Sequence, residues 1–118
     1  MSFSIIVLPF AQIVISNLSL NEGDRLEGNC IGTGNPAPMV AWVRNGVILE
    51  PSLNSSYSLN SSDVQMLVLP DGAGVAYFVS LTLAIPMVTD TDAGTYECLA
   101  VNVAGNDTAD ISVTVNCE

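Results

Sequence analysis

DTDAGTYEC, residues 90–98, places a tyrosine two positions before a cysteine, with an Asp-x-Gly sequence just ahead of both. Side chains two positions apart in a strand point to the same side, so Tyr96 and Cys98 share one face. Asp92 can accept hydrogen bonds from backbone N–H groups of a turn, and Gly94 permits a tight corner. The stretch therefore predicts a turn that leads into a strand whose buried face carries Tyr96 and Cys98.

The chain has three cysteines, Cys30, Cys98 and Cys117. In a reducing compartment they would be free thiols, whereas in an oxidising compartment they would form one bridge and leave one cysteine over. An odd number of cysteines does not by itself decide between these two interpretations.

The composition narrows the class of function. The 118 residues include 12 acidic side chains, two arginines, no lysine and no histidine, which gives a net charge of −10. A nucleic-acid partner and an anionic membrane surface are disfavoured, because both require basic patches. The absence of histidine removes the commonest general base and metal ligand, and we predict no cofactor. Only 12% of residues are charged, against about 25% in an ordinary soluble protein.

Short apolar stretches separated by turn residues run along the chain and predict an all-β sandwich or barrel of about eight or nine strands. Hairpin turns are expected at Asn45-Gly46, at Pro70-Asp71-Gly72 and near residues 104–106. Residues 50–62 are polar and predict a long connection. The apolar opening of residues 2–16 is interpreted as a native strand, with a signal-peptide remnant as the alternative. We predict one domain over residues 1–118, with residues 1–4 and 116–118 as linkers.

The whole pattern resembles an immunoglobulin domain of the I-set. The resemblance rests on NEGDRLEGNC before the first cysteine, GNPAPMVAWVRNG around Trp42, LAI at residues 83–85 and DAGTYECLAVNVAG around the second cysteine. It implies a two-sheet antiparallel Greek-key sandwich with one core disulfide between Cys30 and Cys98. It also implies that Trp42 packs on the disulfide and that the Tyr96 hydroxyl donates to a backbone carbonyl near Asp90.

Three details of this resemblance are open to test. Pro9 is expected to let the first strand begin on one sheet and finish on the other. The spacing between the two bridged cysteines is long for an I-set domain and resembles a variable-type spacing. Gly28 lies at an inward position that is usually filled by a larger residue, so we expect Met39 or a residue of the first strand to fill the gap.

Four Asn-x-Ser/Thr sequons, at Asn17, Asn54, Asn60 and Asn106, predict glycosylation. Chance occurrence in a chain rich in serine and asparagine is the alternative for any one of them. Attached sugars would supply the hydrophilicity that the few charges do not.

Strand alternation predicts an apolar interface. If Trp42, Tyr96 and Cys98 point inward, five aliphatic side chains on two neighbouring strands point outward, and such patches tend to mark interfaces. Ordinary exposed apolar surface is the alternative. The five residues are Ala41, Val43, Leu99, Val101 and Val103. Cys117 is interpreted as a free thiol or as a bridge to a neighbouring domain or a second chain.

No motif predicts an enzyme. GTGNPA lacks the ending of a phosphate-binding loop, the serines have no histidine or lysine to activate them, and the paired aspartates do not form a calcium loop. The resemblance implies an extracellular recognition module of an adhesion or receptor protein that spans the membrane once. Its expected partner is a protein, and a second copy of the same chain, forming a weak homodimer, is one candidate. A receptor tyrosine kinase ectodomain is one parent of this kind. The alternatives are a structural spacer in a tandem array and a variable-type immune receptor domain.

Overall fold

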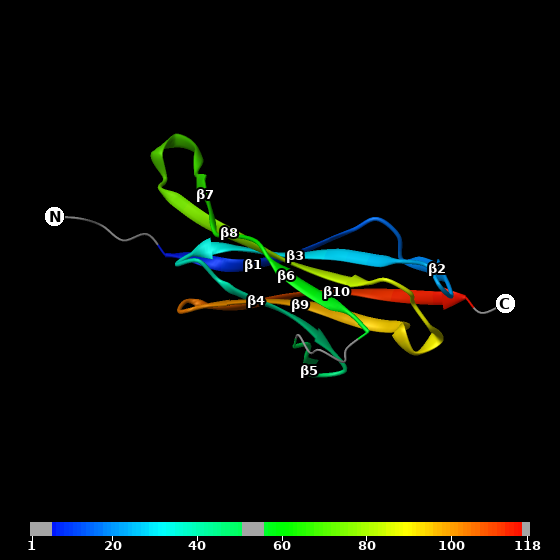
Figure 1. Cartoon of the computed structure of the whole chain (residues 1–118). Helices are drawn as coiled ribbons and strands as arrows, with labels where there is room; N and C mark the ends of the chain where they lie inside the picture. Colours follow the sequence, from blue (N-terminus) through cyan, green and yellow to red (C-terminus); the bar gives the residue numbers. More distant parts are fainter. Residues whose placement is uncertain (1–5, 51–55, 117–118) are drawn as a thin grey trace.

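The computed structural model describes residues 6–50 and 56–116, which form two β-sheets packed face to face (Figure 1). Each sheet has five strands, so the described part of the chain has ten strands where about eight or nine were expected. The all-β sandwich is confirmed. The extra strands lie just after the apolar opening, at residues 19–21, and near the end of the polar connection, at residues 58–61.

The first sheet has the order β1-β3-β8-β6, and β7 pairs with the other part of β8. All of these pairs are antiparallel. A 3-10 turn, η1 (Pro70–Gly72), joins β7 to β8. The strands are β1 (Val7–Ile15), β3 (Leu26–Asn35), β6 (Ser58–Ser61), β7 (Gln65–Val68) and β8 (Val75–Ile85).

The second sheet has the order β2-β10-β9-β4-β5. Its pairs are antiparallel except for β2 and β10, which run parallel, so the predicted antiparallel sandwich is confirmed and carries one parallel pair at this edge. The 3-10 turn η2 (Asp90–Asp92) precedes β9. The strands are β2 (Ser19–Asn21), β4 (Met39–Arg44), β5 (Val47–Ile48), β9 (Gly94–Asn102) and β10 (Gly105–Asn116).

Pro9 does not switch the chain between sheets, and that expectation is wrong. The register of β1 against β3 shifts between Val7 and Phe10, and pairing with β3 then continues to Ile15. The irregularity takes the proline, which has no N–H, out of the ladder without ending the strand. The chain crosses to the second sheet after β1, through the exposed segment before β2.

The hairpin turns follow the local sequence. Asn45 and Gly46 both have positive φ, 52° and 77°, which confirms the predicted two-residue turn between β4 and β5. The β7–β8 hairpin turns at residues 70–72 as expected. In the last hairpin Asn102 pairs with Gly105, so the turn lies slightly earlier than predicted. The Asn102 side-chain oxygen accepts from the Ala104 N–H at 2.8 Å and fixes that turn.

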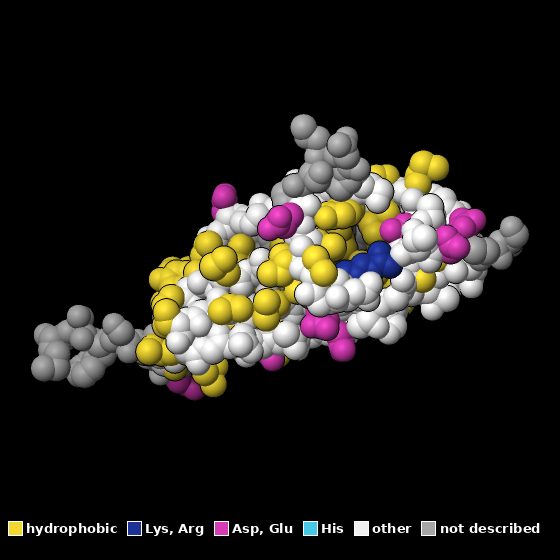
Figure 2. Space-filling model, turned by 90° about the horizontal axis from the view of Figure 1, so that it is seen from below, with side chains coloured by type: hydrophobic (Ala, Val, Ile, Leu, Met, Phe, Trp, Pro, Cys, Tyr) yellow, Lys and Arg dark blue, Asp and Glu magenta, His cyan; other side chains and the backbone are white. Residues whose placement is uncertain are grey.

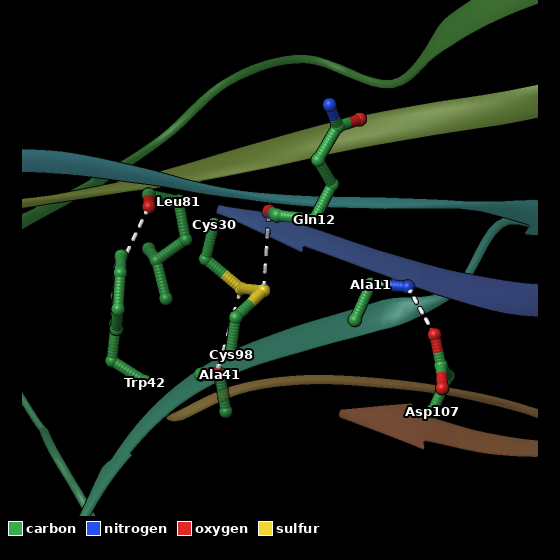
Figure 3. Close-up of a disulfide and its surroundings, with 8 residues drawn as sticks. All are labelled: Ala11, Gln12, Cys30, Ala41, Trp42, Leu81, Cys98 and Asp107. Carbon is green, nitrogen blue, oxygen red and sulfur yellow. Dashed lines mark hydrogen bonds between the residues drawn. A yellow bond between two sulfur atoms is a disulfide. The ribbon is translucent and has the colours of Figure 1, made fainter. Parts of the chain in front are cut away.

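A disulfide between Cys30 and Cys98 joins the two sheets, as the resemblance implied (Figure 3). Both cysteines are fully buried. Trp42 lies directly opposite Cys98 in the pairing of β4 with β9 and is also fully buried. Its indole N–H donates to the Leu81 carbonyl at 2.8 Å, so the one polar atom of the ring is satisfied.

Ile15 fills the space beside Gly28. A Cβ placed on this glycine would lie 3.3 Å from Cδ1 of Ile15 and 3.6 Å from the Trp42 ring. Met39, the other expected candidate, is 78% exposed and lies outside the core. A residue of the first strand therefore occupies the gap.

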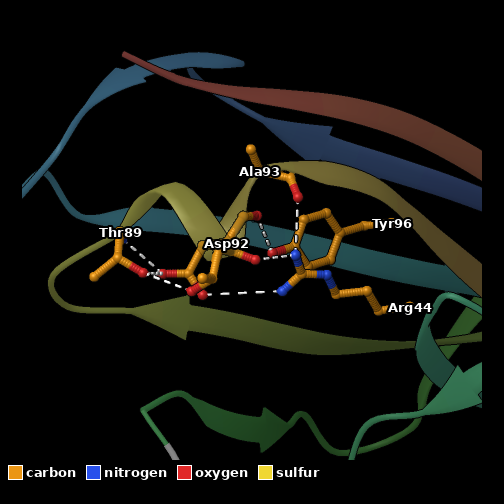
Figure 4. A network of polar contacts seen from close by, with 6 residues as sticks. Arg44, Thr89, Asp92, Ala93 and Tyr96 are labelled. Atoms are coloured by element: carbon orange, nitrogen blue, oxygen red, sulfur yellow. Dashed lines mark hydrogen bonds and ion pairs between the residues drawn. The ribbon is translucent and has the colours of Figure 1, made fainter. Parts of the chain in front are cut away.

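Tyr96 closes the corner between η2 and β9 (Figure 4). Its hydroxyl donates to the Asp92 carbonyl, two residues beyond the expected position near Asp90. The Asp92 carboxylate in turn accepts from the Thr89 N–H at 2.8 Å. Gly94 has a φ of 135°, which strongly favours glycine. Burial raises the pKa of Tyr96 above its ordinary value, which favours the protonated hydroxyl that donates this bond.

Arg44 completes the corner and was missed by the sequence analysis. Its guanidinium carbon lies 5.0 Å from the centre of the Tyr96 ring, within range of a cation–π contact. Its side chain also donates to the Ala93 carbonyl at 2.8 Å and to the Thr91 carbonyl. One of only two arginines in the chain thus ties β4 to the turn before β9.

Tyr96→Phe is expected to keep the fold and to lower the free energy of unfolding by about 1–3 kcal/mol, because the Asp92 carbonyl loses its buried donor. Urea melts of the two proteins would measure the difference. Equal midpoints and slopes would mean that the hydroxyl contributes nothing to the corner.

Candidate functional site

The outward face of the second sheet carries an apolar surface. Along β9, Tyr96, Cys98 and Ala100 are buried, so Leu99 and Val101 point away from the core. The strand register sets their neighbours on β4, because Val101 lies opposite Met39 and Leu99 lies opposite Ala41. Directly opposed residues in an antiparallel pair point to the same side. Two apolar rows therefore run across β9 and β4.

These rows form a shallow groove of about 220 Å³, which we call the β4–β9 groove. Figure 2 shows this side of the molecule, where hydrophobic side chains gather between the middle of the face and its left end. The residues that line the groove are Met39, Val40, Ala41, Ile48, Leu99 and Val101.

Three of the five predicted interface residues, Ala41, Leu99 and Val101, line the groove, whereas Val43 and Val103 do not. Val103 is 83% exposed but lies in the turn after β9. Val43 is half-buried in the next row of the sheet, opposite Glu97. The predicted five-residue patch therefore overlaps the groove only in part.

Met39 and Ile48 belong to the groove and were not in the predicted patch. Alternation along the strand from the inward Trp42 places Met39 on the outward side, so Met39 could have been predicted from the sequence. To predict that Ile48 lies in the groove, one must know the register of the β4–β5 hairpin, in which Ile48 lies opposite Val43. That register follows from the Asn45-Gly46 turn once its two-residue form is known.

Charged side chains lie at one end of the groove and not along it. The row beyond Leu99 and Ala41 contains Glu97, with Asp110 opposite it on β10. None of the groove residues carries a charge. The groove can therefore bury apolar surface without desolvating an ion, while its acidic border opposes an acidic partner at that end.

Three of the four sequon asparagines, Asn17, Asn60 and Asn106, are exposed in the structure. Asn17 lies between β1 and β2, Asn60 lies on β6 and Asn106 begins the exposed alternation of β10. Asn54 and Cys117 lie outside the described residues.

Residues 6–50 and 56–116 contain no cluster of three or more histidine, cysteine, aspartate or glutamate side chains placed to hold a metal ion. Within the same ranges, no helix has the length and apolar character needed to cross a membrane.

The sandwich, its buried disulfide and its tyrosine corner agree with a comparison of the sequence to protein families. The model of the immunoglobulin I-set domain matches residues 9–115. The chain belongs to the immunoglobulin I-set family. Among solved structures, this I-set domain is similar to a chain in the complex of titin M10 with obscurin-like 1 Ig. The two chains superpose with a TM-score of 0.68 and are 28% identical, and the match covers 95% of this chain and 97% of the other chain.

Two curated relatives illustrate the proteins in which similar domains occur. The human leucine-rich repeat and immunoglobulin-like domain-containing nogo receptor-interacting protein 2 is 32% identical over 101 residues. The muscle M-line assembly protein unc-89 of Caenorhabditis elegans is also 32% identical over 101 residues. Each match covers 86% of this chain, but the chain spans only 14% of the first relative and 1% of the second.

Proposed function

We propose that this I-set domain is an extracellular recognition module that binds protein through the β4–β9 groove. The observation that carries the proposal is the uncharged groove itself, formed on an outward sheet face by the alternation that builds the core. Contiguous exposed apolar surface of this kind tends to mark a binding site.

Two features support the extracellular setting. The buried Cys30–Cys98 disulfide is of a kind that persists in oxidising compartments. The exposed sequon asparagines would carry sugars only in a secreted or cell-surface protein. On this reading the domain lies on the cell surface as part of an adhesion or receptor protein.

A second copy of the same chain is the occupant that we favour for the groove. With a net charge of −10, two copies repel each other over most of their surfaces, and the uncharged groove is where that repulsion is weakest. An apolar surface of β-strand side chains is also complementary to itself, as a two-fold interface requires. Association consumes much of the free energy gained by burial, so the expected dimer is weak.

Val101→Glu is expected to abolish this self-association. Val101 is 38% exposed and lies in the middle of the groove, so the substitution adds a charge to the contact without touching the core. In a symmetric dimer the two new carboxylates face an apolar surface, and we expect the dissociation constant to rise about tenfold or more, which corresponds to about 1.4 kcal/mol. Sedimentation velocity of sugar-free protein carrying Cys117→Ser, which excludes a Cys117-linked dimer, would measure it.

Val14→Glu is the matched control. Val14 is 48% exposed on β1 of the opposite sheet, so this variant adds the same charge away from the groove and is expected to associate like the wild type. A wild type that stays monomeric at high micromolar concentration would contradict self-association. Equal weakening by both variants would assign the effect to net charge.

A structural spacer in a tandem array is the second candidate function. β1 begins and β10 ends at opposite ends of the sandwich (Figure 1), an arrangement that suits head-to-tail connection. Similarity to short segments of a muscle assembly protein favours it as well. The spacer function predicts that wild type, Val101→Glu and Val14→Glu are all monomeric.

A further inference from the structure

Asn106 lies beside the β4–β9 groove. In the pairing of β9 with β10, Asn106 is directly opposite Val101 and Thr108 is directly opposite Leu99. Opposed residues of an antiparallel pair point to the same side, with Cβ atoms about 4.5–5.5 Å apart. The alternation of β10 agrees, because the even-numbered residues are exposed and the odd-numbered residues are partly or fully buried after Asn106. Both defining residues of this sequon therefore border the groove.

The local structure leaves the Asn106 side chain available. Its amide makes no hydrogen bond to the described part of the chain and the residue is exposed. The middle residue of the sequon, Asp107, instead points toward β1, where its carboxylate accepts from the Ala11 N–H at 2.7 Å. By contrast, the amide of the nearby Asn102 is used by the carbonyls of Val7 and Pro36.

The other described sequons lie elsewhere. Asn60 is on β6 of the opposite sheet, where it pairs with Thr82. Asn17 lies in the segment between β1 and β2, and its side-chain oxygen accepts from the Ser19 N–H at 3.0 Å. Among the described residues, Asn106 is thus the sequon asparagine that shares a face with Leu99 and Val101.

We propose that Asn106 carries an N-linked glycan that covers the β4–β9 groove, so that glycosylation at this residue controls whether the groove can bind protein. The sugar is large and hydrophilic, and its attachment point faces Val101 across one strand pair. It would cover apolar surface that otherwise faces water, and it would separate a second copy from the row of Val101 and Met39. Control of binding rests on the proposed function; the covering of the groove does not.

Covering of the groove can be tested by chemical labelling. Protein secreted from eukaryotic cells, with Cys117→Ser and Val101→Cys, would be treated with a polyethylene glycol maleimide while peptide mass spectrometry measures occupancy at Asn106. We expect labelling to be about tenfold slower with the glycan than in Asn106→Gln or Thr108→Val, which remove the sequon in two different ways. Asn60→Gln should not change the rate, and Val14→Cys should react equally with or without the Asn106 glycan.

Control of binding is tested by sedimentation of the same secreted proteins with the native valine at position 101. Glycosylated wild type and Asn60→Gln should be monomeric, whereas Asn106→Gln should associate. An unoccupied Asn106, or equal labelling rates at position 101, would overturn the covering. Slow labelling of the glycosylated protein together with a monomeric Asn106→Gln would support the covering and contradict self-association, so the two failures are distinguishable.

Discussion

Replacing Cys30 and Cys98 together by alanine is expected to lower the free energy of unfolding by about 4 kcal/mol. The bond links residues 68 apart in sequence, and in the chain-entropy model a loop of this length is costly to close in the unfolded state. Domains of this size are stable by about 5–15 kcal/mol, so the variant would be marginal at body temperature. Chemical denaturation at 25 °C would measure the loss.

Cys117→Ala is the control for this experiment, since it removes a cysteine outside the Cys30–Cys98 pair and should leave the unfolding midpoint unchanged. The double variant should also lose stability through the packing of the sulfurs, because both cysteines are fully buried beside Trp42. A double variant as stable as the wild type would contradict a stabilising role for the bridge.

The architecture could be predicted from sequence because several independent local signals agree. Tyr96 and Cys98 fix the inward face of β9, and the Asn45-Gly46 turn fixes the register between β4 and β5. Each signal depends on residues close together in the chain, where alternation and turn chemistry act directly. The pairing of Cys30 with Cys98 came from the family resemblance, because sequence spacing alone does not identify disulfide partners.

The parts that sequence did not predict depend on contacts between distant segments. Arg44 packs on Tyr96 and bonds to the turn before β9, and nothing near it in the sequence indicates this. Pro9 indicated a break, but whether the chain then changes sheets depends on how well β1 continues along β3. In the groove, alternation predicted on which face of the sheet each side chain lies. The register across three strands determined that Met39 and Ile48 lie beside Leu99 and Val101.

Trp42→Ala is expected to lower the free energy of unfolding by about 3–5 kcal/mol. The indole is among the largest fully buried side chains. It packs between the disulfide and the space beside Gly28, where a Cβ placed on this glycine would lie 3.6 Å from the ring. Truncation leaves a cavity that rigid strands on both sides cannot close. Thermal and urea unfolding would measure the loss.

Trp42→Phe separates packing from hydrogen bonding at the same position. Phenylalanine keeps an aromatic ring over the disulfide but has no N–H to donate to the Leu81 carbonyl, so we expect a smaller loss, of about 1–3 kcal/mol. Because Trp42 points inward and the groove points outward, the phenylalanine variant should retain the wild-type dissociation constant in sedimentation while it melts earlier. A phenylalanine variant that loses as much stability as the alanine variant would indicate that the hydrogen bond, and not the ring volume, accounts for the contribution of Trp42. A change in its association would mean that the core and the groove are coupled through β4.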